Sequence, residues 1–340
     1  MKKISLVVTD YLKNNLIFDD SGLHRDDIFD RFVELRKEFK LYGYDLSTDD
    51  INSIEESEFV IYSSNMPQIL PRVKNKSFII LSESEFIRPD NYDRSKHGHF
   101  NKVFTWHDDF VNNKKYIKLN YAHKFPSDIK HGYDRKLCHL ISANKKAPHS
   151  VENDLYCKRV DVIRWFEQNH PNDFDLYGVN WDQVVFSSHK LTILMNKSAL
   201  LNKLLNALFF KEYPSFKGRV DNKKETMEKY RFSICFENAK DIPGYITEKI
   251  FDSFFAGCIP IYWGANNIQK YIPSNCYVDM RSFISFEELY LHISSISEEE
   301  YVNYIENIER YLDSDSAKQF SSQGFAKTIR ETIIGDSHDN

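Results

Sequence analysis

Residues 230–264, YRFSICFENAKDIPGYITEKIFDSFFAGCIPIYWG, decide the fold of this chain. The stretch begins with an apolar run, continues through a polar loop and an apolar helix, and ends in a second apolar run. Apolar runs separated by a helix are typical of buried strands in a parallel α/β sheet. Open sheets of this class bind ligands at the carboxyl ends of their strands. A binding edge is therefore predicted at the polar residues of the loop, which are Glu237, Asn238, Tyr245, Glu248 and Lys249.

Lys249 is the most informative of these residues. It falls in the first turn of the predicted helix, for which Thr247 is the expected N-cap. The helix dipole makes that end positive, so a lysine there is mildly unfavourable. A bound phosphate reverses the sign, because exposed N–H groups, the dipole and the ammonium then all favour the anion. The alternative is a solvated lysine bridged to Glu248.

The same stretch resembles the donor-binding motif of glycosyltransferase family 10, the α1,3/4-fucosyltransferases. The resemblance rests on three segments: Phe236-Glu237-Asn238, GYITEK from Gly244 to Lys249, and GCIPIYWG from Gly257 to Gly264. It implies the GT-B fold, in which two Rossmann-like domains face each other across a cleft. The pattern of the sequence by itself predicts an α/β protein with two domains and a helical C-terminal tail.

The composition excludes several classes of protein. The chain has 340 residues, 41% of them hydrophobic and 28% charged, as expected for a soluble protein of two domains. A net charge of −5 gives no general reason to bind nucleic acid. Five cysteines without a C-x-x-C spacing are expected to be free thiols. There is no apolar run of membrane-spanning length, and the run Ile4–Val8 is too short for a signal peptide. We therefore expect a cytoplasmic protein, at most peripheral at a membrane.

Strand and helix patterns alternate along both halves of the chain. The first half predicts an amphipathic helix over Asp26–Phe39 and the strands Lys3–Val8, Phe59–Tyr62, Ser77–Leu81, Lys102–Trp106 and Tyr116–Leu119. The second half predicts the strands Leu137–Ser142 and Phe174–Val179, the helices Val151–Asn169 and Leu200–Phe210, and a short helix capped by Asp221. The predicted domains are 1–130 and 131–315, followed by a helical tail over 316–340. The resemblance implies that the first domain binds the acceptor and carries the catalytic base, and that the second binds the GDP-sugar.

The resemblance implies a role for each residue of the donor motif. Lys249 would face the pyrophosphate of GDP-fucose, and Glu248 would accept hydrogen bonds from ribose hydroxyls. Tyr245 would pack on the base or bond a phosphate oxygen. Asn238 or Glu237 would reach the fucose, although Glu237 can also be interpreted as a carboxylate that caps the loop.

An arginine is also implied, because family members place one after the first strand of the donor domain. Here that strand runs into Ser142, and Arg159 and Arg164 follow on the next helix. Arg159 is preferred because it precedes the aromatic pair Trp165-Phe166, while Arg164 stays open. A guanidinium binds a diphosphate through paired, charge-assisted hydrogen bonds. The alternative is an exposed helix arginine.

The resemblance implies a glutamate base at the end of a strand in the first domain. The strand SFIIL runs into Ser82-Glu83-Ser84-Glu85, so Glu83 takes that position and Glu85 is the alternative. On an extended strand both carboxylates would lie on one face and repel, which would raise the pKa of one of them. The alternative is that the two glutamates only form a polar strand end, with their negative charge balanced by Arg88.

These residues lead to one expected function and two alternatives. The expectation is an inverting fucosyltransferase that moves L-fucose from GDP-fucose to a hydroxyl of a GlcNAc-type or related sugar in a surface glycan or its lipid-linked precursor. The alternatives are an enzyme for another GDP-sugar and a non-catalytic nucleotide-sugar-binding protein. No metal or other cofactor is expected, because Asp173-Phe174-Asp175 and Asp313-Ser314-Asp315 do not follow a strand.

Overall fold

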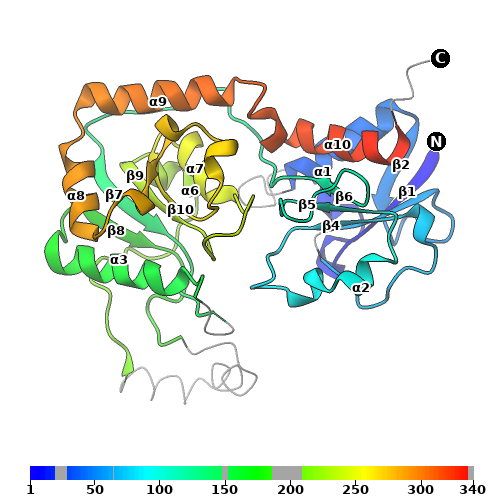
Figure 1. The fold of residues 1–340 in the computed structure, drawn as a ribbon, viewed down its shortest axis with the longest axis horizontal. Helices are drawn as coiled ribbons and strands as arrows, with labels where there is room; N and C mark the ends of the chain where they lie inside the picture. The colour runs from blue at the N-terminus through cyan, green and yellow to red at the C-terminus, as the bar shows by residue number, and fades with distance from the viewer. Residues whose placement is uncertain (20–28, 64, 148–151, 186–208, 336–340) are drawn as a thin grey trace. The chain divides into compact units, whose positions relative to one another are not determined.

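The computed structural model describes residues 1–19, 29–63, 65–147, 152–185 and 209–335. The chain divides into two compact units. The first unit comprises Met1–Phe125, Pro243–Glu248 and Leu312–Asn340, and the second comprises Pro126–Ile242 and Lys249–Tyr311. Each unit contains one parallel β-sheet (Figure 1). The predicted α/β class with two parallel-sheet units is confirmed, although the loop before Lys249 and the C-terminal helix belong to the first unit.

The sheet of the first unit has the strand order β2-β1-β3-β4-β5-β6. Every pairing in it is parallel. Its strands are β1 (Lys2–Val7), β2 (Tyr44–Thr48), β3 (Phe59–Tyr62), β4 (Ser77–Leu81), β5 (Lys102–Thr105) and β6 (Tyr116–Lys118). The runs FVIY and SFIIL form strands because they are apolar and β-branched, and β4 is buried along its whole length.

Helices of the first unit pack around a hydrophobic core. They are α1 (Asp30–Leu41), α2 (Arg94–His97) and α10 (Ser322–Ile334). Helices α1 and α10 lie side by side, and the rings of Phe32 and Phe325 meet edge to face at 5.7 Å (Figure 1). Short 3-10 turns complete the unit at Asp10–Leu12, Leu16–Phe18, Lys74–Lys76, Pro89–Tyr92 and Lys318–Phe320.

The sheet of the second unit has the strand order β11-β10-β9-β7-β8, again with parallel pairings. Its strands are β7 (Lys136–Ile141), β8 (Phe174–Tyr177), β9 (Tyr230–Phe236), β10 (Ile259–Trp263) and β11 (Val278–Asp279). Its helices are α3 (Tyr156–Asn169), α6 (Lys223–Met227), α7 (Glu248–Phe255), α8 (Phe286–Ser295) and α9 (Glu298–Leu312). Further 3-10 turns lie at Ile268–Lys270, Ser274–Cys276 and Met280–Ser282.

The strand order of the second unit places a topological switch point between β7 and β9. The chain leaves β7 for β8 on one side and later returns to β9 on the other. A crevice forms at such a point, because the connections leaving the two strands diverge to opposite faces of the sheet. The residues that follow β7 and β9 are therefore the ones to examine for a ligand site.

Several local predictions need correction. Strand β2 was not predicted, because its sequence YDLST carries polar residues, although Ser47 and Thr48 are buried. Asp221 does not cap α6, since the side chain of Asn222 accepts the hydrogen bond from the Glu225 backbone N–H. The region from Phe286 to Ile333, which the sequence predicts to be helical throughout, forms three helices, α8 to α10, with breaks between them. The predicted helix Leu200–Phe210 lies almost wholly outside the described residues.

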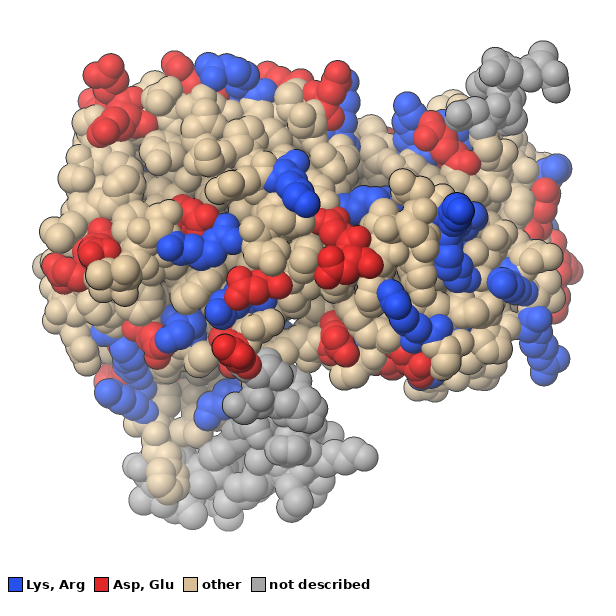
Figure 2. Space-filling model, in the orientation of Figure 1, with Lys and Arg blue, Asp and Glu red and all other residues tan. Residues whose placement is uncertain are grey.

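Other global expectations can be compared with the structure directly. All five cysteines are free thiols, with Cys157 exposed and the other four buried. Within the described parts of the chain, no helix is long and apolar enough to cross a bilayer. On the face drawn in Figure 2, basic and acidic side chains are interspersed rather than gathered into a patch of one sign.

Candidate functional site

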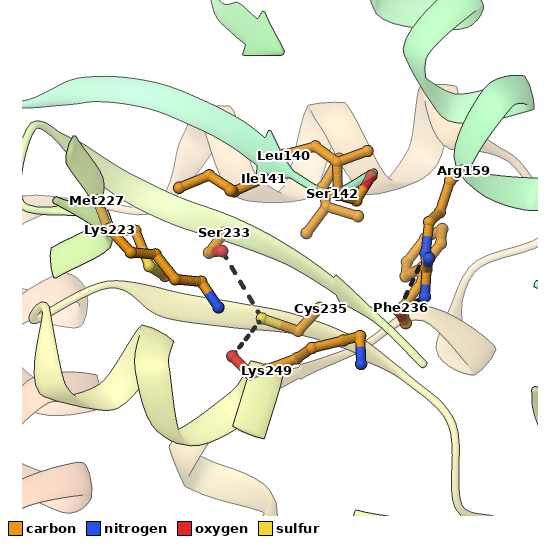
Figure 3. A pocket seen from close by; sticks show the side chains of 11 residues that line it. Leu140, Ile141, Ser142, Arg159, Lys223, Met227, Ser233, Cys235, Phe236 and Lys249 are labelled. Atoms are coloured by element: carbon orange, nitrogen blue, oxygen red, sulfur yellow. Dashed lines mark hydrogen bonds between the residues drawn. The ribbon is translucent and has the colours of Figure 1, made fainter. Parts of the chain in front are cut away.

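A small cavity opens at the switch point of the second unit, between the carboxyl ends of β7 and β9. Its volume is about 20 Å³, which is room for one water-sized group. Figure 3 shows its lining, which includes Ser142, Arg159, Lys223, Cys235, Phe236 and Lys249. Three residues predicted from separate parts of the sequence, Ser142, Arg159 and Lys249, therefore lie around one cavity.

Lys249 has a buried carboxylate as its partner. Helix α7 begins at Glu248, so Thr247 occupies the predicted N-cap position and is itself buried. The Lys249 Nζ atom lies 3.0 Å from Glu237 Oε2, and Glu237 is 0% exposed. The lysine is partly exposed at 21%. Glu237 is not among the residues that line the cavity. It can influence a ligand there through Lys249, because it holds the ammonium in place and offsets part of its charge.

Arg159 reaches the cavity from α3 and is almost fully buried. Its Nε and Nη2 atoms donate to the Phe236 carbonyl at 3.2 and 2.7 Å, and Nη2 also donates to Asn238 Oδ1 at 3.0 Å. These bonds fix the loop that leaves β9. Arg164 points elsewhere, because its guanidinium donates to the carbonyls of Lys211 and Glu212. Of the two candidate arginines, the structure brings Arg159 to the cavity.

Ser142 presents a buried hydroxyl to the same cavity. Its backbone is held on both sides, since its N–H donates to the Tyr177 carbonyl at 3.0 Å and its carbonyl accepts from Trp181 Nε1 at 2.7 Å. Among the described residues, its Oγ atom has no hydrogen-bond partner. Buried hydroxyls without a partner are rare and costly, so a water or a ligand oxygen is expected here.

Lys223 is a cavity residue that the sequence analysis missed. It lies at the start of α6, and its ammonium forms an ion pair with the Asp252 carboxylate of α7. Figure 3 shows the Lys223 side chain directed toward Cys235, whose Sγ donates to the Lys249 carbonyl at 3.2 Å. Burial raises the pKa of Cys235 to about 12, so this thiol is protonated at neutral pH. No motif of the sequence marks Lys223, because only the packing of α6 on β9 brings it there.

Tyr245 packs against an aromatic side chain. It belongs to the first unit, is 1% exposed, and its ring centroid lies 4.7 Å from that of Trp106. The expected contact of Tyr245 with the base or with a phosphate oxygen of the donor stays a prediction. The preceding Gly244 has φ +80°, and a Cβ there would lie 2.4 Å from the Trp106 carbonyl oxygen. Only glycine fits this approach.

The candidate base lies on an irregular segment rather than on a strand. Strand β4 ends at Leu81, so the prediction that Glu83 and Glu85 share a strand face is wrong. Glu83 is half-buried and Glu85 is exposed. The Ser82 carbonyl accepts hydrogen bonds from Trp106 Nε1 at 2.9 Å and from the Tyr121 hydroxyl, which fixes the backbone immediately before Glu83.

Arg88 does not balance the glutamates by an ion pair. It forms a bidentate pair with Asp90, with distances of 2.8 Å from Nε and 2.7 Å from Nη2. This pair and the nearby Glu83 raise the pKa of Arg88, and the Asp90 hydrogen bond is the largest cause. Arg88 therefore forms its ion pair with Asp90 and also interacts electrostatically with Glu83, so the interpretation of Arg88 as a balancing charge stays open.

The two Asp-x-Asp triplets lie away from the cavity. Asp173 accepts a hydrogen bond from the Tyr290 hydroxyl at 2.9 Å, and Asp175 accepts from Lys136 and Tyr230, each at 2.7 Å. Both aspartates lie at the amino end of β8, opposite to the carboxyl edge. Asp315 pairs with Lys318. In the described ranges, no group of three or more His, Cys, Asp and Glu side chains could hold a metal ion.

Comparison with known proteins shows what this region is similar to. Residues 186–329 match Glycosyltransferase family 10 (fucosyltransferase) C-term. The chain is 41% identical to the Alpha-(1,3)-fucosyltransferase FucT of Helicobacter pylori over 175 residues, which are 47% of this chain and 36% of that protein. It is 33% identical to an Alpha-(1,4)-fucosyltransferase of Arabidopsis thaliana over 73 residues, 22% of this chain and 18% of that protein. The matches thus span about a third or less of these relatives.

Solved structures share the fold of the whole chain. A crystal structure of an alpha1,3-fucosyltransferase with GDP matches with a TM-score of 0.55, covering 100% of this chain and 93% of that one at 15% identity. A second, with GDP-fucose, matches with a TM-score of 0.54 at 16% identity and the same coverage. Identities this low establish the GT-B fold class alone. The family match over residues 186–329 agrees with the resemblance that the motif around Lys249 carries: this part of the chain is similar to the C-terminal domain of glycosyltransferase family 10, the fucosyltransferase family.

Proposed function

We propose that the protein is an inverting fucosyltransferase that transfers L-fucose from GDP-fucose to a hydroxyl of a GlcNAc-type sugar in a glycan. The observation that carries this proposal is the meeting of Ser142, Arg159 and Lys249 around one cavity at the switch point of the second unit. A hydroxyl, a guanidinium and an ammonium at the mouth of a helix form a set of donors suited to a diphosphate.

The donor site would hold GDP by its charged oxygens. Lys249 would bind the diphosphate as a point charge, and Lys223 would add a second ammonium at the other side of Cys235. The Ser142 hydroxyl would donate to a phosphate oxygen. Arg159 would keep the Phe236–Asn238 loop in place and contribute its positive charge at short range. Glu248, beside Lys249 in the first turn of α7, would accept hydrogen bonds from ribose hydroxyls.

Transfer would proceed as a single displacement. The acceptor oxygen attacks the anomeric carbon of fucose while the bond from that carbon to the β-phosphate oxygen breaks. GDP leaves with the bonding electrons, and the cations around the cavity stabilise the charge that develops on its β-phosphate. Glu83, with Glu85 as the alternative, would take the proton of the acceptor hydroxyl. This step inverts the configuration at the anomeric carbon.

No metal is required in this scheme, because the two lysines and Arg159 would supply the positive charge that a divalent ion supplies elsewhere. Transfer should therefore survive an excess of EDTA. We further propose a surface glycan or its lipid-linked precursor as the acceptor and an α1,3 linkage. The linkage follows the name of the Helicobacter pylori relative, an Alpha-(1,3)-fucosyltransferase.

A transfer assay tests the proposal. The protein is incubated with GDP-fucose and N-acetyllactosamine, and the product is analysed by NMR. We expect a fucosylated product with the inverted anomeric configuration. Release of free fucose alone, or transfer from UDP-sugars but not from GDP-fucose, would contradict the proposed function.

A further inference from the structure

The peptide groups on both sides of Glu83 have hydrogen-bond donors from other segments of the first unit. The Ser82 carbonyl accepts bonds from the Trp106 indole Nε1 at 2.9 Å and from the Tyr121 hydroxyl. The Glu83 carbonyl accepts a bond from Asn91 Nδ2 at 3.4 Å. Because peptide groups are planar, fixing the one before and the one after a residue fixes the direction of its Cα–Cβ bond. These donors therefore set the direction in which the Glu83 side chain leaves the backbone.

Trp106 can hold the Ser82 carbonyl because its own position is fixed. It is 2% exposed, and its ring contacts two other rings of the first unit. The centroid of the Tyr245 ring lies 4.7 Å away, and that of the His107 ring lies 5.3 Å away in a stacked arrangement. The backbone is held as well, since the Trp106 carbonyl accepts a hydrogen bond from Lys118 Nζ at 2.6 Å. The indole N–H is thus presented from a rigid site.

Asn91 holds the peptide that follows Glu83 and is itself fixed. It is 0% exposed, and its Oδ1 atom accepts a hydrogen bond from the Met66 backbone N–H at 2.8 Å. The two donors of its amide go to the Glu83 carbonyl and to Asn65 Oδ1, the latter at 3.1 Å. Its own backbone carbonyl accepts a bond from His97 Nε2 at 2.9 Å. With this peptide held, the direction of the Glu83 side chain depends on the two donors to the preceding carbonyl.

We infer that Trp106 and Tyr121 are positioning residues for proton transfer, because they aim the Glu83 carboxylate at the acceptor hydroxyl. Glu83 lies on irregular backbone beyond the end of β4, where no strand pairing orders it. A general base must lie within hydrogen-bond reach of the proton it takes, and a displacement of about 1 Å can slow a reaction by about 10²-fold. Fixed neighbours supply that precision. The inference rests on the proposed transferase function and adds to it the residues that hold its base.

The test compares Trp106→Phe and Tyr121→Phe, singly and together, with Tyr44→Phe. Each of the first two substitutions removes one donor to the Ser82 carbonyl and keeps an aromatic ring. Tyr44 is the matched control, because it is also a half-buried tyrosine of the first unit that packs on another ring, that of Phe59 at 6.1 Å. It lies at the amino end of β2, which is the opposite edge of the sheet. Thermal melting confirms that each variant is folded.

Each single variant should lower kcat by about tenfold and the double variant by about 10²-fold, since the Ser82 carbonyl loses first one donor and then both. The KM for GDP-fucose and the GDP affinity measured by calorimetry should keep their wild-type values. In a Glu83→Gln background, assayed with enzyme in excess, the same substitutions should lower the residual rate no further, because no base is left to aim. Tyr44→Phe should leave kcat unchanged in both backgrounds.

Three results would overturn the inference while leaving the proposed function intact. They are a wild-type kcat in the double variant, a loss that falls on KM or GDP affinity instead of kcat, and an equal fold-loss in the wild-type and Glu83→Gln backgrounds, which marks a structural defect. If the double variant does not fold, the single variants are judged by the same results. A wild-type protein that does not transfer fucose, or a wild-type kcat in Glu83→Gln itself, would instead refute the proposed function or its base, and the inference with it.

Discussion

The ammonium of Lys249 lies 3.0 Å from the carboxylate of Glu237, a residue that is completely buried. A buried carboxylate requires a partner, so Lys249 stabilises the fold in addition to its proposed contact with the diphosphate. When the diphosphate arrives, it must share this lysine with Glu237. The pair therefore couples the stability of the second unit to the occupancy of its donor site.

Lys249→Met should lower both the affinity for GDP and the stability of the protein. The affinity should fall by about tenfold or more, since a charge-assisted hydrogen bond is lost. The free energy of unfolding should fall by about 1–3 kcal/mol, because Glu237 loses its counter-charge. Calorimetry with GDP and urea unfolding measure the two effects.

The double variant Lys249→Met/Glu237→Gln separates the two roles of the lysine. It should recover much of the stability, because the buried carboxylate is gone, yet it should bind GDP as weakly as the single variant. If the double variant also recovered GDP affinity, Lys249 would be a purely structural partner of Glu237.

Glu83→Gln should abolish transfer while leaving GDP binding unchanged, because the amide cannot take the acceptor proton. A loss of kcat of about 10²–10⁴-fold is expected for a general base. Glu85→Gln is the matched control, since this side chain is exposed and lies two residues on. If Glu85→Gln lost activity and Glu83→Gln kept it, the assignment would pass to the alternative. Wild-type kcat in both variants would refute both assignments.

Lys223→Met should weaken GDP binding several-fold, by about 1 kcal/mol, because one cation of the cavity is lost. Lys224→Met is the control, as Lys224 belongs to the same short helix but pairs with Glu228 and does not line the cavity. The comparison is made by calorimetry at low and high salt, and the difference between the variants should shrink at high salt. Equal affinities of the two variants at low salt would remove Lys223 from the donor site.

Gly244→Ala should destabilise the first unit more than Gly43→Ala does. Both glycines have a similar backbone, with φ of +80° and +82°. A Cβ at Gly43 meets nothing within 4 Å, whereas one at Gly244 would lie 2.4 Å from the Trp106 carbonyl oxygen. Urea unfolding should show a loss of about 1 kcal/mol for Gly43→Ala from strain alone, and a clearly larger loss for Gly244→Ala. Equal losses would mean that the Trp106–Gly244 approach is not tight.

Acid should destabilise the second unit through His139. This side chain is fully buried in β7 beside the Tyr230 ring, and burial lowers its pKa to about 3 from an ordinary value of 6.5. Between these values the unfolded chain binds a proton that the folded chain excludes, so stability falls as the pH drops below about 6.5. From pH 7.5 to pH 5.0, the wild type should lose about 2 kcal/mol more than His139→Phe.

Urea unfolding at the two pH values measures this difference, with His99→Gln as a control at an exposed position. If His139→Phe lost as much stability as the wild type, the carboxylates rather than this imidazole would account for the acid sensitivity.

The strands show what sequence patterns could predict. Phe59–Tyr62 and Ser77–Leu81 were predicted with the bounds that the structure has, because continuous apolar runs between polar loops have few other interpretations. Strand β2 was missed because Ser47 and Thr48 look like loop residues in the sequence. Their burial is compensated by hydrogen bonds with distant or neighbouring side chains, such as that of the Thr48 N–H to Asn15 Oδ1 at 2.9 Å.

The candidate site also has parts that the sequence could predict and parts that it could not. The motif around Lys249 could be recognised from local sequence, since a helix start and its flanking strands are local features. The partner of Lys249 could not, because Glu237 precedes it by a loop whose path depends on tertiary packing. Tyr245 was assigned to the donor by the family resemblance, and that role stays a prediction. Its packing on Trp106, which lies far away in the sequence, could not be predicted from the motif. Lys223 carries no motif, so only the folded chain reveals that it lines the cavity.

Thermal unfolding of the wild-type protein with different nucleotides tests the central claim most directly, namely that the cationic edge of the second unit binds guanosine diphosphate. Melting is compared with and without GDP, GDP-fucose, GDP-mannose, UDP and UDP-sugars. GDP and GDP-fucose at about 100 times Kd should add about 2.7 kcal/mol of stability, and the uridine nucleotides should add none at the same concentration. The absence of any shift with GDP, or an equal shift with UDP, would contradict the account.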